Sequence, residues 1–117
     1  MTAVEPFSLQ TEARPGCVVL AVTGEVDLGT APQLKDRLTD LVAEGHRHVV
    51  VDLTATEFLD STGLGALVAG LKRLRAHQGD MRVACNTPRV RKVFEITHVD
   101  RVLPMFDSVD EACRAGE

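Results

Sequence analysis

The chain has 117 residues, of which 44% are hydrophobic and 26% are charged, and its formal net charge at pH 7 is -4. This length corresponds to a single domain, residues 1–117 with a core over about 7–115, and the composition excludes a disordered chain, which needs few apolar residues. Because the chain is mildly acidic and its only aromatic residues are four Phe, it lacks the positive charge and stacking platforms of nucleic-acid binders, and we expect no direct nucleic-acid partner.

The N-terminal segment predicts an antiparallel hairpin. Residues 7–13 alternate between apolar and polar side chains at their start, as an edge strand does, and residues 17–22 form a continuous Val-rich run. Such a run is typical of a strand that is buried on both faces. Pro15 and Gly16 lie between the two segments and favour a turn, so the strands are expected to pair.

The rest of the chain alternates between predicted helices and strands. One helix begins with Thr30 as its N-cap and ends at Gly45, and another begins at Ser61 and ends near Gly79, each with apolar side chains on one face. The other segments are strands over 48–53, 81–85 and 103–106, a connection over 54–60, a helix opened by Thr87, and a helix from Ser108 to about Arg114. This order predicts an α/β fold, with a mostly parallel sheet of four or five strands, an antiparallel hairpin at its edge and about four helices.

Two loops that follow predicted strands are rich in small, polar and acidic residues. They are GEVD at residues 24–27 and DSTGLG at residues 60–65. Ligands and partners of open α/β sheets gather at the carboxyl ends of the strands, so these loops are the candidate functional region. Ser61 begins the helical stripe, and we expect it to be the N-cap, with its hydroxyl accepting a hydrogen bond from the amide of Gly63 or Leu64.

Two glycines, Gly63 and Gly65, lie in the first turn of that predicted helix. Each costs roughly 1 kcal/mol of helix stability relative to alanine. Two explanations are open at this point. The glycines allow the helix to pack tightly on the sheet, or they allow another backbone or a ligand to approach closely.

Known catalytic and cofactor-binding motifs do not fit the region of Ser61. A nucleophile elbow would need glycine at Leu59, and neither a P-loop nor a dinucleotide fingerprint matches the glycines that follow. His46 and His48 have no third ligand nearby in the sequence. We therefore expect no catalytic residue, no metal, no cofactor and no enzymatic activity, with a small hydrolase that uses Ser61 as an alternative.

The three cysteines are Cys17, Cys85 and Cys113, and their spacing fits neither a disulfide framework nor a zinc site. We expect all three to be small buried apolar side chains, in a reduced, cytoplasmic setting. No stretch approaches the roughly 18 to 20 apolar residues of a membrane helix, and no signal peptide is visible, so we expect no membrane association.

Five segments of the chain form a set that occurs together in one known family. They are VVVDL at 49–53, FLDSTGLG at 58–65, GEVD at 24–27, TAPQL at 30–34 and the C-terminal stretch over 100–108. In this order and spacing they resemble STAS domains and, most closely, bacterial anti-sigma factor antagonists. One departure is His98, which follows the third predicted helix at a turn where many members have glycine.

The resemblance implies a partner switch that is controlled by phosphorylation. In such proteins the unphosphorylated form binds an anti-sigma factor that is also a serine kinase, and this binding releases the sigma factor. The kinase then phosphorylates the serine that follows the Asp, here Ser61, and a PP2C-type phosphatase removes the phosphate. The residues expected to contact the partner are Asp27, Asp60, Thr62, Gly63 and Leu64. We expect the free protein to be a monomer or a weak dimer.

A phosphate on Ser61 would add about -1.5 to -2 charges at a helix N-terminus, where anions are favoured. We therefore expect phosphorylation to leave the fold intact and to act on the interface, with Gly63 and Gly65 giving the kinase access to the hydroxyl. Replacing Asp27 with alanine is expected to weaken partner binding while changing the melting temperature by no more than about 4 to 8 °C. The alternative function is a STAS scaffold or accessory module of a sensory complex or transporter, with no sigma-factor role.

Overall fold

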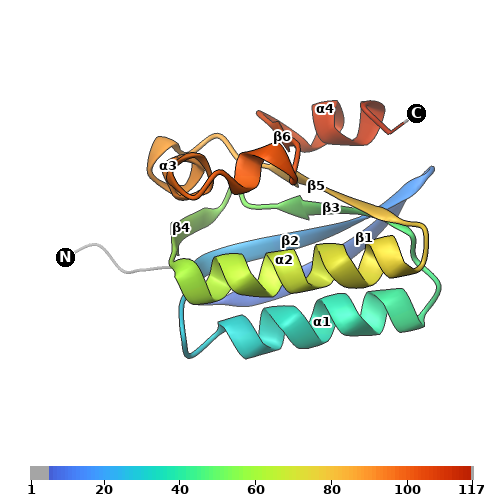
Figure 1. Cartoon of the computed structure of the whole chain (residues 1–117), viewed down its shortest axis with the longest axis horizontal. Coiled ribbons are helices and arrows are strands. Elements are labelled where there is room, and N and C mark those ends of the chain that lie inside the picture. The colour runs from blue at the N-terminus through green and yellow to red at the C-terminus, as the bar shows by residue number, and fades with distance from the viewer. Residues whose placement is uncertain (1–5, 117) are drawn as a thin grey trace.

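The computed structural model describes residues 6–116 and shows a sheet with helices packed on both of its faces (Figure 1). The strands are β1 (Ser8–Arg14), β2 (Cys17–Val26), β3 (His48–Asp52), β4 (Thr56–Leu59), β5 (Asp80–Ala84) and β6 (Met105–Phe106). The helices are α1 (Ala31–Ala43), α2 (Ser61–Ala76), α3 (Pro88–Ile96) and α4 (Val109–Arg114), with a 3-10 turn, η1, at Val99–Arg101. In this part of the chain no helix is both long and apolar enough to cross a bilayer.

The sheet is mixed and mostly parallel, with the strand order β1-β2-β3-β5-β6. β1 and β2 form the antiparallel hairpin at one edge, from the Ser8–Thr23 pair to the Arg14–Cys17 pair at the turn. The pairs β2–β3, β3–β5 and β5–β6 are all parallel. These pairings confirm the predicted α/β class and the edge hairpin, and residues 6–116 contain the four predicted helices. The sheet has six strands where four or five were predicted.

The sixth strand, β4, lies where the sequence predicts only a connection over 54–60, and that prediction is wrong for residues 56–59. β4 pairs in parallel with the last residues of β2. Thr56 is buried and its hydroxyl donates a 2.7 Å hydrogen bond to the carbonyl of Val22. A strand of four residues is too short to show a clear alternating pattern, so its identity depends on this contact with a distant strand.

Side chains along β2 point alternately into two separate hydrophobic cores. Leu20 and Val22 belong to the larger core, which lies under α1 and α2, and Val19 belongs to a smaller core with Val50 and with Ala112 of α4. Successive side chains of a strand point to opposite faces, so one apolar run supplies both cores. The predicted strand over 17–22 is thus buried on both faces, as expected.

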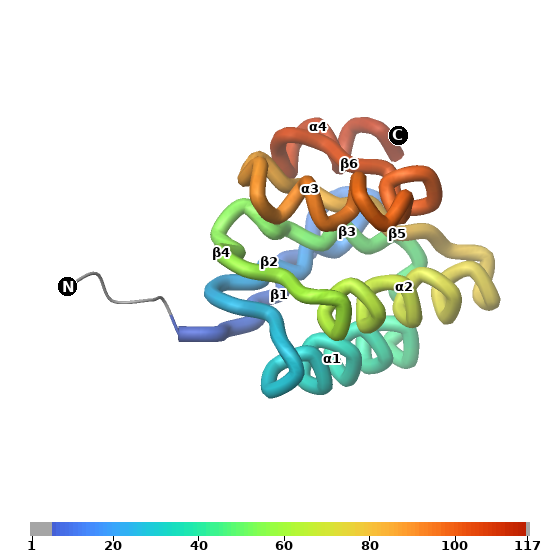
Figure 2. Tube along the Cα trace, turned by 60° about the vertical axis from the view of Figure 1, so that its left-hand side comes forward, coloured from blue at the N-terminus to red at the C-terminus, as the bar shows by residue number. Residues whose placement is uncertain are grey.

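The two long helices begin at the same edge of the sheet. α1 follows β2 and α2 follows β4, and both run back along one face, side by side (Figure 2). α3 contributes Val90 and Phe94 to the same core, whereas α4 packs on the opposite face. The residues that open α1 and α2 therefore meet where β2 and β4 end. We call this region the strand-end rim: the loop at residues 27–30 and the first turn of α2 at residues 60–65.

Candidate functional site

The strand-end rim is built on the pairing of β2 with β4. Val26 lies opposite Leu59 in the register, and the amide of Asp60 donates a 3.1 Å hydrogen bond to the carbonyl of Val26. Asp27 directly follows Val26, so both loops leave the sheet from paired positions. The structure thus places the two loops that the sequence singled out at one edge.

Asp60 is the N-cap of α2. One of its carboxylate oxygens, Oδ1, accepts hydrogen bonds from the amides of Thr62 at 2.9 Å and Gly63 at 3.0 Å. The carbonyl of Asp60 accepts the first helical bond, from the amide of Leu64. The prediction that Ser61 is the N-cap is therefore wrong by one residue. An N-cap needs a non-helical backbone and a side-chain oxygen that accepts bonds from the first amides of the helix, and Asp60 provides both.

Ser61 is consequently the first helical residue, and its side chain is exposed. Within residues 6–116 its hydroxyl has no hydrogen-bond partner, because Asp60 already satisfies the amides that Ser61 was expected to bond. The hydrolase alternative needs a general base within hydrogen-bond reach of Ser61, and none is bonded to it in the part of the chain that the structure describes. A free, exposed hydroxyl at a helix N-terminus is open to modification.

Asp27 fixes the loop that leads into α1. Its carboxylate Oδ1 accepts hydrogen bonds from the amides of Gly29 at 2.9 Å and Thr30 at 3.2 Å. The Thr30 hydroxyl accepts a bond from the Asp27 amide and donates one to the carbonyl of Glu25. Thr30 occupies the predicted N-cap position of α1, but its hydroxyl bonds back into the loop and makes no cap bond to the helix.

The two glycines of the first α2 turn have different surroundings. A Cβ atom at Gly63 would lie 2.6 Å from Leu59 Cδ1 and 2.6 Å from Val26 Cγ1, whereas one at Gly65 would meet nothing within 4 Å. Gly63 is buried and Gly65 is exposed. Gly63 therefore allows α2 to pack closely on β2 and β4, and the expectation that it opens access to Ser61 is wrong; for Gly65 that expectation stays a prediction.

The other residues expected to contact a partner differ in exposure. Thr62 is exposed, while Leu64 is buried in the main core and Gly63 lies beneath the surface. Asp27 and Asp60 are half-buried. The accessible polar side chains of the rim thus include the two carboxylates, Ser61 and Thr62. Contact of a partner with Gly63 or Leu64 stays a prediction.

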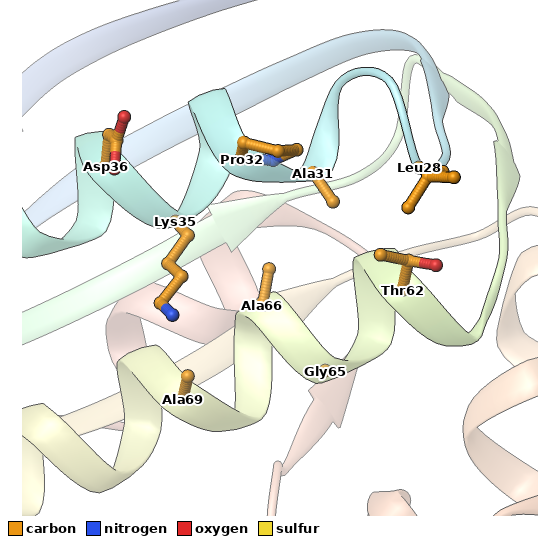
Figure 3. A pocket seen from close by; sticks show the side chains of 9 residues that line it. All are labelled: Leu28, Ala31, Pro32, Lys35, Asp36, Thr62, Gly65, Ala66 and Ala69. Atoms are coloured by element: carbon orange, nitrogen blue, oxygen red, sulfur yellow. The ribbon is translucent and has the colours of Figure 1, made fainter.

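A groove of about 510 Å³ runs from the rim between α1 and α2 (Figure 3). Its floor is a stripe on α2 formed by Thr62, Gly65, Ala66 and Ala69. The residues that line it from the other side are Leu28, Ala31, Pro32, Lys35 and Asp36. The i, i+3, i+4, i+7 spacing of small residues on α2 is the sequence signal that could have located this groove.

Two exposed apolar side chains at this edge are not among the residues predicted from the sequence. Leu28 lies between Asp27 and Gly29 with 75% of its surface exposed, and Phe58 of β4 is 42% exposed. Exposed large apolar residues next to polar ones are typical of interaction sites when they gather in one region. They add an apolar component to a rim that the sequence described only by its polar residues.

Residues suited to metal binding do not gather in the described part of the chain. Across residues 6–116 no three His, Cys, Asp or Glu side chains are placed to hold a metal ion. His48 instead contacts Asp80, with Nδ1 2.8 Å from Oδ1. The chemistry of the rim is therefore that of its hydroxyl, its carboxylates and its apolar groove.

Comparison with known proteins places this arrangement in a family. The family model described as the STAS domain matches residues 8–112. The chain belongs to the STAS domain family. This STAS domain is 32% identical over 91 residues to the anti-sigma-B factor antagonist of Staphylococcus aureus, with 78% of this chain and 84% of the relative covered.

Solved structures agree with this assignment. The crystal structure of an anti-sigma factor antagonist from Mycobacterium paratuberculosis matches this STAS domain with a TM-score of 0.89 and 31% identity, covering 98% of this chain and 97% of that chain. The phosphorylated form of SpoIIAA from Bacillus matches with a TM-score of 0.72 and 21% identity, covering 94% and 100%. At that identity the second likeness shows a shared fold alone.

Proposed function

We propose that this STAS domain is an anti-sigma factor antagonist whose unphosphorylated form binds a kinase-type anti-sigma factor through the strand-end rim and thereby releases a sigma factor. Phosphorylation of Ser61 by that kinase ends the binding, and a PP2C-type phosphatase restores it. The names of the relatives at 31% and 32% identity support the general role. The observation that carries the switch is the exposed Ser61 hydroxyl, which no hydrogen bond to the rest of residues 6–116 engages.

The position of Ser61 explains how a phosphate would act without unfolding the domain. The modified oxygen makes no structural bond, because Asp60 caps α2, and the helix dipole favours an anion at this end. The rim already carries the carboxylates of Asp27 and Asp60. A phosphate of about -1.5 to -2 charges would roughly double this local negative charge. The added charge therefore weakens the binding of a partner that must approach the rim, and it does not reduce the stability of the fold.

The groove between α1 and α2 supplies the apolar part of the proposed interface. It begins beside Thr62, the neighbour of Ser61, and Leu28 stands exposed at its edge. Apolar side chains of the partner that fill this groove would be desolvated, and buried apolar anchors carry most of the energy of an interface. A charged phosphate at the mouth of the groove would oppose that desolvation.

The test is incubation of the chain with its cognate anti-sigma factor and ATP, followed by intact-mass measurement. We expect one added phosphate on the wild type and none on Ser61→Ala. Thr62→Ala, which alters the neighbouring exposed hydroxyl, should still accept the phosphate. An unmodified wild type would shift support to the scaffold or transporter-accessory role.

Calorimetric titration with the same anti-sigma factor tests the effect on binding. Ser61→Ala should bind as tightly as the unphosphorylated wild type, and Ser61→Glu should bind at least about tenfold more weakly, a loss of about 1.4 kcal/mol. Melting temperatures of both variants should stay near that of the wild type, because Ser61 makes no structural bond. Equal affinity of Ser61→Glu and wild type would refute the switch.

A further inference from the structure

Two cysteines far apart in the sequence lie in contact at the other end of β2. The Sγ atoms of Cys17 and Cys113 are 3.1 Å apart, and 96 positions separate the two residues. Both side chains are half-buried, whereas Cys85 is fully buried. The expectation that all three thiols are buried is therefore wrong for this pair. We propose that Cys17 and Cys113 form an oxidisable pair that closes to an intramolecular disulfide and fastens α4 to the sheet.

The elements that carry the two thiols are held together by contacts other than the thiols themselves. Cys17 begins β2 and Cys113 lies in α4, and both pack against the smaller core that includes Val19 and Ala112. A disulfide forms only between cysteines that the backbone already brings together in a suitable geometry. Packing of α4 on this core provides that closeness without the bond.

An ion pair beside the thiols adds a second link between the same elements. Arg14 is the register partner of Cys17 across the hairpin, and its Nη1 lies 2.8 Å from Oδ1 of Asp110. Asp110 precedes Cys113 by three positions, about one turn of α4, so the two links lie side by side. This contact with the Arg14 guanidinium also lowers the pKa of the Asp110 carboxyl, which keeps the pair charged.

Both thiols line surface cavities that a small oxidant can enter, and the cavity at Cys17 has a volume of about 440 Å³. A surface cavity of about 210 Å³ reaches Cys113 and is lined by Arg14, Pro15, Asp110 and Arg114 as well. Burial, together with the hydrogen bond to Cys113, raises the pKa of Cys17 to about 11. Cys17 thus remains a protonated thiol near neutral pH, and we assign the first reaction with the oxidant to Cys113.

A peroxide, such as hydrogen peroxide, is the class of oxidant that we propose for this pair of thiols. The sulfur of Cys113 attacks one peroxide oxygen, the O–O bond breaks, and the products are a sulfenic acid and water. The sulfur of Cys17 then attacks the Cys113 sulfur, the S–O bond breaks, and the hydroxyl leaves as water with the Cys17 proton. In total, two thiols and one peroxide give one disulfide and two water molecules.

The experiment treats the full, reduced chain with hydrogen peroxide and maps the products by mass spectrometry after alkylation. We expect the intact mass to fall by two hydrogens, a linked peptide pair that contains Cys17 and Cys113, and a Cys85 thiol that can still be alkylated. The oxidised protein should melt about 10 °C higher than the reduced one, since a disulfide across a long loop restricts the unfolded chain. A thiol reductant should reverse both changes.

Matched variants assign the effect to the pair. Cys17→Ser and Cys113→Ser should lose the mass change and the gain in melting temperature, whereas Cys85→Ala should retain both. The peptide map of the wild type decides the question even if a variant does not fold. Oxygen addition without a link, a link that involves Cys85, a link between two chains, or no reaction would each overturn the proposal.

Discussion

The two ends of β2 are held by different kinds of contact. At its carboxyl end, the side chains of Asp27 and Asp60 accept hydrogen bonds from backbone amides of the loops that open α1 and α2. At its amino end, side chains contact side chains: Arg14 with Asp110 and Cys17 with Cys113. The side-chain bonds at the carboxyl end join residues two or three positions apart within each loop, whereas both contacts at the amino end join residues 96 positions apart.

This difference determines how each end responds to covalent modification. Hydrogen bonds to backbone amides hold the strand-end rim, and Ser61 takes no part in them. We therefore expect a phosphate on Ser61 to change the surface and to leave the fold in place. A disulfide between Cys17 and Cys113 would instead change the stability of α4 on the sheet and leave the rim untouched. The proposed modification sites, Ser61 on the strand-end rim and the Cys17–Cys113 pair, thus lie at opposite ends of β2.

Gly63→Ala disturbs the packing beneath the strand-end rim and has the largest expected effect on stability among the rim variants. The new methyl group would lie 2.6 Å from side-chain atoms of Val26 and Leu59, which must move. Overpacking of this kind costs about 1 to 3 kcal/mol of unfolding free energy. Denaturant unfolding measures the loss.

Gly65→Ala is the matched control, in the same turn of α2. The added methyl group meets no atom within 4 Å, so the helix should gain about 0.5 to 1 kcal/mol from its higher propensity. If both variants changed stability in the same direction and to the same extent, the packing role assigned to Gly63 would be incorrect.

Asp27→Ala tests the backbone bonds that hold the rim and should have a smaller effect. Removing the carboxylate leaves the amides of Gly29 and Thr30 without their acceptor, which costs about 1 kcal/mol, or a drop of roughly 4 to 8 °C in melting temperature. Partner affinity should fall as well, because the loop beside Ser61 loses its support. Thermal unfolding and calorimetric titration measure the two effects.

Asp27→Asn separates the structural part from the charge. Its amide oxygen can accept the same backbone bonds, so the melting temperature should return close to that of the wild type. An affinity that remains low in Asp27→Asn would assign the negative charge to partner contact. Equal melting temperatures for the alanine and asparagine variants would contradict the role given to these bonds.

The sequence predicts most of this fold because its apolar pattern is clear. The helical stripes of α1 and α2 and the apolar run of β2 each bury a continuous face, and such periodicity is the most reliable local sign of structure. The departure at His98 is also informative. Its backbone has φ of 62°, in the left-handed region where glycine is favoured, which agrees with the turn inferred from the resemblance.

Three features could not be predicted from the sequence, because they depend on contacts between distant segments or on a choice between two similar residues. Asp60 and Ser61 can both serve as an N-cap, and only the extended backbone of Asp60 decides between them. The packing role of Gly63 depends on Val26, which lies 37 positions earlier in the sequence. The contact between Cys17 and Cys113 depends on how α4 docks, and no local pattern encodes it.

Alkaline pH should reduce the stability of the fold through the thiol at the amino end of β2. This is the smallest of the expected effects. Burial, with the hydrogen bond to Cys113, raises the pKa of Cys17 from the ordinary 9.0 to about 11, while Arg14 of β1 and Arg82 of β5 act in the opposite direction. The unfolded chain therefore loses this proton at lower pH than the folded chain does. The resulting stabilisation is present below pH 9.0 and is lost as the pH rises through about 11.

Melting curves of the reduced protein between pH 7 and 11 measure this loss. The melting temperature of the wild type should fall more steeply with pH than that of Cys17→Ser, which has no thiol to ionise at this position. Ser61→Ala, which changes only the rim, should follow the wild type at every pH, because Ser61 and Cys17 lie at opposite ends of the β2 layer. Parallel curves for wild type and Cys17→Ser would show that ionisation of this thiol is not linked to folding, whereas divergence of Ser61→Ala would show that the two ends do not act separately.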